Sequence, residues 1–191
     1  ADEALVSSDG AVAPWARAPR AEIWIYDHDS NKIASADPSK VQFSLANGRL
    51  PIPQWEWNTP NIKVGNTLFG DSKNAAVRWK VTLANTDSEP HHLTMLLTVR
   101  PFAINQNTTP ICSIRAKRHR QLWINDLPFM IAETPASDTG AGSLLESMTE
   151  ALLGEGPFKK NVRDLEAADG VPIWAYPIVL DPSQSAQFHF A

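Results

Sequence analysis

Val77-Arg78-Trp79-Lys80-Val81-Thr82-Leu83 is the segment that decides the fold class, because apolar and polar residues alternate through it without interruption. Successive side chains of a β-strand point to opposite faces, so the Val, Trp, Val and Leu side chains share one face. This pattern predicts a half-buried strand. A polar turn at 85–90 separates it from the apolar segment 92–99, and the three segments together predict an antiparallel hairpin.

Further short segments rich in β-branched and aromatic residues lie on both sides of this hairpin. Strands are predicted at 21–26, 41–45, 62–64, 67–70, 111–114, 121–124, 129–132, 173–180 and 187–190. Pro51 and Pro53 exclude a central strand at that point and require an edge or a bend. About ten short strands with frequent turns indicate a mostly-β protein, a large antiparallel β-sandwich.

One domain is expected over residues 1–191, with two atypical parts. Residues 1–20 are rich in Ala, Ser and Pro and predict an extended lead-in. A short helical insertion is predicted at 143–168, where apolar residues recur at helical spacing. The resulting apolar stripe either packs on the sandwich or docks against a neighbouring domain. It consists of Leu144, Leu145, Met148 and Leu152.

Composition excludes several functional classes. The chain has 191 residues, a net charge of −4 and a pI near 5.7, which argues against a nucleic-acid or membrane-surface binder. Cys112 is the single cysteine, so no internal disulfide forms, and its apolar surroundings predict a buried thiol. The first residue is Ala1, which fits either a mature terminus after signal cleavage or an excised piece of a longer chain. Periplasmic, secreted and cytoplasmic locations therefore all stay open.

Four phrases of the sequence resemble a known enzyme module in their order and spacing. They are GRLPIPQWEW at 48–57, VRWKVTLANTDSEPHHLTMLLTVRPFAINQ at 77–106, SIRAKRHRQLWINDLPFMI at 113–131 and AYPIVLDPSQSAQF at 175–188. The module is the β-sandwich that precedes an (α/α)6 barrel in bacterial glycogen-debranching-like and related glycoside hydrolases. The resemblance extends over most of residues 40–191, and its motifs are structural.

The resemblance implies a twisted supersandwich beside a sugar-processing barrel, in the same chain or in a partner chain. The family's catalytic acid and base lie in the barrel, so no catalytic residue is carried over to this chain. One departure concerns the hairpin at 115–120, which is acidic to neutral in the family and basic here. That difference leaves open whether the family and this chain share a ligand at the hairpin.

Trp55, Glu56 and Trp57 form the first candidate sugar-binding group, with Trp123 as a further aromatic residue. Indoles stack on the C–H faces of sugars while a carboxylate accepts hydrogen bonds from hydroxyl groups. The spacing of the two Trp residues, however, favours a core face with the Glu side chain directed outward. Trp24 and Trp174 are further candidates for a solvent-facing platform.

The segment 115–120 carries the sharpest charge cluster of the chain. Its cationic residues are Arg115, Lys117, Arg118 and Arg120. Such a cluster binds phosphate or an acidic polysaccharide, or it is simply the solvated tip of a hairpin. No aromatic residues are interleaved with it, which argues against nucleic acid.

No metal site and no cofactor are expected. His91 and His92 are adjacent on a predicted strand and point to opposite faces, so they do not readily share an ion. Asp27 and Asp29 leave a Ca²⁺ ion open, although the loop has no EF-hand pattern. No phosphate loop, dinucleotide fingerprint or serine-nucleophile motif is present.

Three functions follow from these observations. The first is a non-catalytic accessory sandwich that packs against a catalytic barrel and shapes its cleft. The substrate of that barrel would be a polysaccharide or oligosaccharide. The second is a stand-alone carbohydrate-binding module that uses exposed Trp residues. The third is a small glycoside hydrolase that pairs Glu56 with a second carboxylate, such as Asp27, Asp29 or Asp126.

Overall fold

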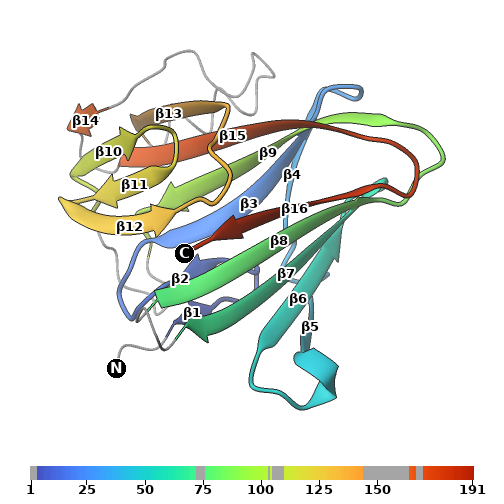
Figure 1. The fold of residues 1–191 in the computed structure, drawn as a ribbon, viewed down its shortest axis with the longest axis horizontal. Coiled ribbons are helices and arrows are strands. Elements are labelled where there is room, and N and C mark those ends of the chain that lie inside the picture. Colours follow the sequence, from blue (N-terminus) through green and yellow to red (C-terminus); the bar gives the residue numbers. More distant parts are fainter. Residues whose placement is uncertain (1–3, 72–75, 103, 105–109, 144–163, 167–169) are drawn as a thin grey trace.

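The protein folds as a mostly-β sandwich of antiparallel sheets, as the alternating patterns predict (Figure 1). The computed structural model describes residues 4–71, 76–102, 104, 110–143, 164–166 and 170–191. Among these residues the strands form three sheets, of seven, five and four strands.

The seven-stranded sheet has the order β1-β2-β3-β9-β15-β13, with β4 paired to β3. Its strands are β1 (Leu5–Val6), β2 (Val12–Ala13), β3 (Arg20–Asp27), β4 (Lys32–Ser35), β9 (His91–Arg100), β13 (Asp138–Ser143) and β15 (Gly170–Leu180). The central strand β9 is buried along almost its whole length.

The five-stranded sheet has the order β16-β8-β7-β6-β5. Its strands are β5 (Gln42–Leu45), β6 (Pro53–Asn58), β7 (Ile62–Asp71), β8 (Ala76–Asn85) and β16 (Ser185–Phe190). A 3-10 turn, η1 (Ala46–Gly48), follows β5 at the outer end of this sheet, at the lower right of Figure 1.

The four-stranded sheet has the order β12-β11-β10-β14. Its strands are β10 (Ser113–Lys117), β11 (Gln121–Ile124), β12 (Leu127–Ile131) and β14 (Asp164–Glu166). An isolated bridge between Ala132 and Phe190 connects it to the end of β16 in the five-stranded sheet.

One hydrophobic core joins all three sheets. Ile25 and Leu97 come from the seven-stranded sheet, Val81 and Leu83 from the five-stranded sheet, and Leu122 from the four-stranded sheet. A smaller cluster lies on the other face of the seven-stranded sheet and consists of Tyr26, Leu96, Val171, Ile173 and Ala175. The alternation in β3 and β9 therefore sends apolar side chains to both faces of this sheet.

A row of aromatic rings runs across the inner face of the five-stranded sheet. Phe43 stacks on Trp55, and Trp55 stacks on Trp79, with ring centroids 6.4 Å apart in both pairs. The Trp79 indole N–H donates a 3.0 Å hydrogen bond to Oδ1 of buried Asn66, which lies on the strand between them. Asn66 in turn donates to the carbonyl of Trp55 at 3.4 Å. The polar group is thereby satisfied inside the core.

The structure confirms the hairpin that decided the fold class and extends it to β8 and β9. Trp79, Val81 and Leu83 are buried as predicted. The segments predicted separately at 62–64 and 67–70 form one continuous strand, β7. The residues between them continue the ladder, because Gly65 and Asn66 pair with Thr82 and Val81.

Within the lead-in, β1 and β2 pair with each other and join β3, so this segment is part of the seven-stranded sheet. One residue differs from expectation. Cys112 is exposed, because Ile111 beside it takes the buried position in front of β10. The predicted thiol burial is therefore wrong.

The predicted helical insertion at 143–168 lies largely outside the described residues. Its apolar stripe falls entirely on residues that the structure does not describe. Within the described part, Asp164–Glu166 is extended and pairs with β10, so the backbone hydrogen bonds of a sheet replace those of a helix there. Nor do the described residues contain a helix with the length and hydropathy needed to span a bilayer.

We expect Gly10→Ala to destabilise the fold far more than Gly48→Ala. Both glycines have positive φ, +76° and +70°, so an Ala residue costs on the order of 1 kcal/mol at either position. A Cβ atom at Gly10 would also lie 2.7 Å from Nε1 of the buried Trp55, whereas Gly48 faces open space. Overpacking adds about 1–3 kcal/mol. Urea unfolding of both variants checks the difference, and equal losses would contradict the close contact with Trp55.

Candidate functional site

Trp55 and Trp57 are core residues, with 2% and 4% of their surface exposed. Both lie on the face of β6 that packs into the sandwich, as their period-two spacing favoured. Trp174 is likewise buried. A sugar needs an open ring face for stacking, so the predicted platform does not include these three indoles. The larger gain from burying indole area in the core explains their placement.

Glu56 points away from the core and forms an ion pair with Lys63 on the neighbouring strand β7. Its Oε2 atom lies 2.6 Å from Nζ of Lys63, and both side chains are close to 40% exposed. An exposed pair of this kind contributes about 0–1 kcal/mol to stability. The carboxylate of Glu56 is therefore paired with a cation, and this contact does not place a second carboxylate beside it.

The other acids proposed for hydrolysis are held by turns and ion pairs. Asp126 lies 3.1 Å from Arg115. The pKa of Asp29 is lowered, first by the hydrogen bond from the backbone N–H of His92. Oδ1 of Asp27 accepts from the backbone N–H of Asp29 at 2.9 Å, within the turn that follows β3. A glycosidase general acid needs a raised pKa, so these environments oppose that role.

The basic cluster and Trp123 come together on the outer face of the four-stranded sheet. Arg115 on β10 is directly opposite Trp123 on β11, and Lys117 is opposite Gln121. Nζ of Lys117 lies 4.3 Å from the Trp123 ring centroid, which is a cation–π contact. The sequence assigned these residues to two different ligands, and the hairpin register places them on one face.

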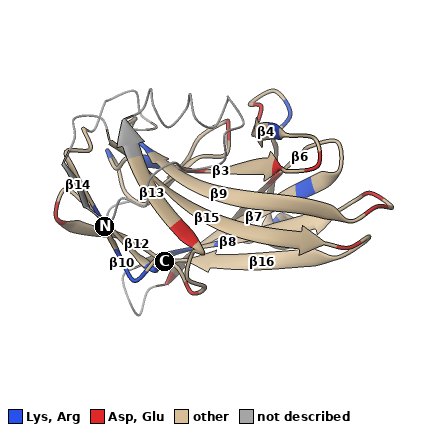
Figure 2. Ribbon diagram, turned by 90° about the horizontal axis from the view of Figure 1, so that it is seen from above, with Lys and Arg blue, Asp and Glu red and all other residues tan. Residues whose placement is uncertain are grey.

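A shallow groove runs along this hairpin. It is lined by Lys117, Arg118, Arg120, Gln121 and Ile131. Figure 2 shows Lys and Arg positions in blue along this part of the ribbon, next to β10 and β12. Ile131 was not predicted to lie here, because its pairing with Gln121 depends on strand register. A prediction of the β11–β12 hairpin register would have found it.

The tip of the hairpin is anchored to the protein. Nε of Arg120 donates to the carbonyl of Ala132 at 2.8 Å. The carbonyl of His119 accepts a 2.8 Å bond from the N–H of Ala136. The exposed cations therefore project from a backbone that is anchored at this turn.

The two turns of this sheet use different residues for the same backbone conformation. Arg118 and His119 both have φ of 53° in the β10–β11 turn, and Asn125 and Asp126 have φ of 50° and 62° in the β11–β12 turn. Asn, Asp and His are enriched at positive φ, whereas the Arg118 side chain strains it by about 1–2 kcal/mol. Strain of this kind gathers at functional sites. Arg118 therefore occupies a turn position that Asn or Gly would adopt with less backbone strain.

Comparisons with known proteins identify no family. No protein-family model and no curated protein matches the chain. One similar solved structure is described as "Putative kojibiose phosphorylase from human microbiome", with a TM-score of 0.44 and 10% identity. The alignment covers 99% of this chain and 24% of that one, so the chain spans about a quarter of its length. At that TM-score the similarity carries no argument about function.

Replacing Arg118 by Asn and His119 by Gly should stabilise the protein by about 1–2 kcal/mol. The Asn-Gly pair suits two consecutive positive φ angles and relieves the strain at the tip. Asp126→Asn is the matched control and should change stability by less than about 1 kcal/mol, because Asn tolerates its φ of 62° and only the exposed ion pair with Arg115 is lost. The midpoints of urea unfolding measure both. No gain in the double variant would show that the tip is unstrained.

Proposed function

We propose that this chain is a non-catalytic β-sandwich of a carbohydrate-active protein, which packs the outer end of its five-stranded sheet against a neighbouring catalytic barrel. The observation that carries the proposal is the uncovered apolar surface of β5. Phe43 is 51% exposed and Leu45 is 45% exposed. They alternate with polar residues on one face of the strand.

This surface is a continuation of the inner face of the sheet. Phe43 is directly opposite Trp55 and stacks on it, so the ring points to the side that forms the core elsewhere. Leu50, just beyond η1, is a further exposed apolar residue. An inner face left open at the end of a sheet is an unusual use of large apolar side chains and typically marks a contact surface.

The strand edge supports the same proposal. β5 is the last strand in the order of its sheet, so its outer backbone groups have no strand partner among the described residues. Proteins normally protect such edges with charges, bulges or a covering segment. Covering the exposed halves of Phe43 and Leu45 would contribute on the order of 2 kcal/mol.

The partner is proposed from the sequence resemblance. The order of motifs between residues 48 and 188 is similar to that of the sandwich that precedes an (α/α)6 barrel in glycogen-debranching-like glycoside hydrolases. In such an arrangement the barrel supplies the acid and base, and the sandwich needs none. The environments of Glu56 and Asp126 agree with that division.

We expect the native protein from its source, as one polypeptide or as a complex, to be much heavier than 21.0 kDa, because the barrel belongs to the same chain or to a partner chain. Hydrogen exchange should then show β5 amides protected in the native protein and fast in the isolated chain. Strand β12, which also exposes large apolar residues, is the control and should exchange equally in both. A native mass near 21.0 kDa with no co-purifying barrel, or unchanged β5 exchange, would overturn the proposal.

A second candidate function is binding of an acidic polysaccharide by the basic groove. The specific observation in its favour is the Lys117–Trp123 pair on an anchored, strained hairpin. The cations around the ring suit carboxylate or sulfate groups. This function is compatible with the first one.

Polygalacturonate should change the Trp fluorescence of the chain, and neutral glycogen should not. We expect Trp123→Phe to reduce the signal change and Lys117→Gln to weaken binding several-fold, with affinity falling as salt rises. Trp24→Phe and Lys63→Gln are matched controls, because Trp24 hydrogen-bonds Glu22 and Lys63 pairs with Glu56 away from the groove. Equal binding in Lys117→Gln and Lys63→Gln would remove the groove as the site.

A further inference from the structure

Two loops that are distant in the sequence bring three potential ligands together at one end of the sandwich. Asp27 ends β3 and Asp29 lies in the turn that follows, while His91 begins β9. One ligand atom from each of these three side chains lies within 4.8 Å of the others. The backbone connects the two loops directly, because the N–H of His28 donates to the carbonyl of His92 at 3.0 Å.

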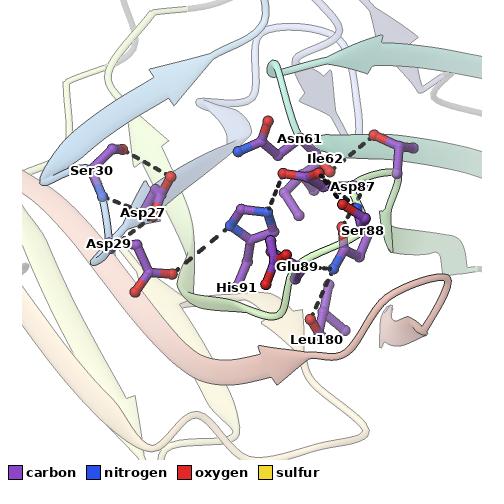
Figure 3. Close-up of polar contacts among 12 residues, drawn as sticks. Asp27, Asp29, Ser30, Asn61, Ile62, Asp87, Ser88, Glu89, His91 and Leu180 are labelled. Atoms are coloured by element: carbon purple, nitrogen blue, oxygen red, sulfur yellow. Dashed lines mark hydrogen bonds and ion pairs between the residues drawn. The ribbon is translucent and has the colours of Figure 1, made fainter.

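The imidazole of His91 is the key member of this cluster. Its residue is 7% exposed, and Nε2 lies 3.1 Å from Oδ2 of Asp87. Nδ1 is also buried and has no hydrogen-bond partner among the described residues. The carboxylate oxygen closest to Nδ1 is Oδ2 of Asp29, at a distance of 3.9 Å that is too long for a hydrogen bond (Figure 3).

The contact with Asp87 decides which nitrogen of His91 is free. A carboxylate only accepts hydrogen bonds, so the Nε2–H group donates to Oδ2 of Asp87. Nδ1 is therefore the ring nitrogen left to ligate an ion. It lies within 4.8 Å of one carboxylate oxygen from each of Asp27 and Asp29.

Neighbouring groups hold both carboxylates in place. Oδ1 of Asp27 accepts from the N–H of Asp29 at 2.9 Å, and its Oδ2 accepts from the hydroxyl of Ser30 at 2.8 Å. Oδ2 of Asp29 accepts from the N–H of His92 at 2.9 Å. Oδ1 of Asp27 also accepts from the N–H of Ser30 at 3.3 Å. The Oδ2 atoms of Asp27 and Asp29 each accept one of these bonds and retain a lone pair for an ion.

We infer that Asp27, Asp29 and His91 form a binding site for a divalent transition-metal ion, with zinc as the best match. The Asp87–His91 contact reproduces the carboxylate–histidine arrangement that orients metal-bound imidazoles. One nitrogen and two carboxylate ligands suit Zn²⁺, leave a fourth position for water and balance its charge. A buried nitrogen ligand argues against Ca²⁺, which prefers oxygen throughout.

Binding of an ion requires the ligand atoms to move slightly closer together. Zn–N and Zn–O bonds of about 2.0–2.2 Å place tetrahedral ligand atoms roughly 3.3–3.6 Å apart. The Nδ1–Oδ2 separation between His91 and Asp29 is 3.9 Å, so the exposed Asp29 side chain moves by less than about 1 Å for that pair. A bound ion would fasten the β3–β4 turn to the β8–β9 loop, whatever the function of the β5 surface or the basic groove.

Calorimetric titration of the metal-free chain with ZnCl₂ tests the inference. We expect one ion per chain and a higher Tm with zinc, because the ion binds the folded state alone. Asp29→Asn should lower the affinity at least tenfold. Asp37→Asn is the matched control, since Asp37 is an exposed turn residue that accepts from Ser39 just as Asp27 accepts from its own turn. His92→Ala should keep the site, because His92 contacts Asp29 from the exposed side.

A second measurement covers the case in which Asp29→Asn does not fold. Two-dimensional ¹H–¹⁵N spectra of the wild-type imidazoles should show zinc shifting Nδ1 of His91. Loss of zinc in His92→Ala with retention in Asp29→Asn would mean adventitious binding at a surface histidine. That result, tighter binding of CaCl₂ than of ZnCl₂, or an unshifted His91 Nδ1 at millimolar zinc would each overturn the inference.

Discussion

The indole N–H of Trp79 and the side chain of Asn66 meet inside the sandwich, and the register of the five-stranded sheet depends on this contact. A slip of one residue would turn the ladder's apolar residues to solvent. It would also leave a buried indole N–H and a buried amide without partners, which costs about 1–3 kcal/mol per group. The amide of Asn66 also bonds Trp55, so a single polar residue fixes the positions of three neighbouring strands, β6, β7 and β8.

The same register explains why the sheet ends in an apolar surface. Once Trp55 faces inward, Phe43 opposite it must face inward too, because directly paired residues share a face. The core covers Trp55 and leaves half of Phe43 in contact with water. The exposed ring is therefore a consequence of strand pairing, and a covering partner would complete the aromatic row.

Some buried polar groups of this protein have hydrogen-bond partners, and others have none among the described residues. Inside the sandwich Asn66 finds both a donor and an acceptor. At the β3–β4 end, Nδ1 of His91 is buried near the carboxylates of Asp27 and Asp29 and has no hydrogen-bond partner among the described residues. At the basic hairpin, Arg118 and His119 take backbone angles that suit Asn or Gly better. Buried groups without partners occur in the sheets as well, where the indole N–H groups of Trp55 and Trp174 have no hydrogen-bond partner among the described residues.

Sequence alone determined the strands and the inward direction of Trp55, Trp79 and Val81, because side-chain alternation is a local property of an extended backbone. It could not reveal that Lys117 lies on Trp123, which depends on hairpin register. The sequence also could not predict that Asp29 lies near His91. That proximity depends on the pairing of β3 with β9, and these two strands are far apart in the sequence. Only the tertiary structure decided these contacts, since strand pairing brings distant segments together and no local pattern encodes it.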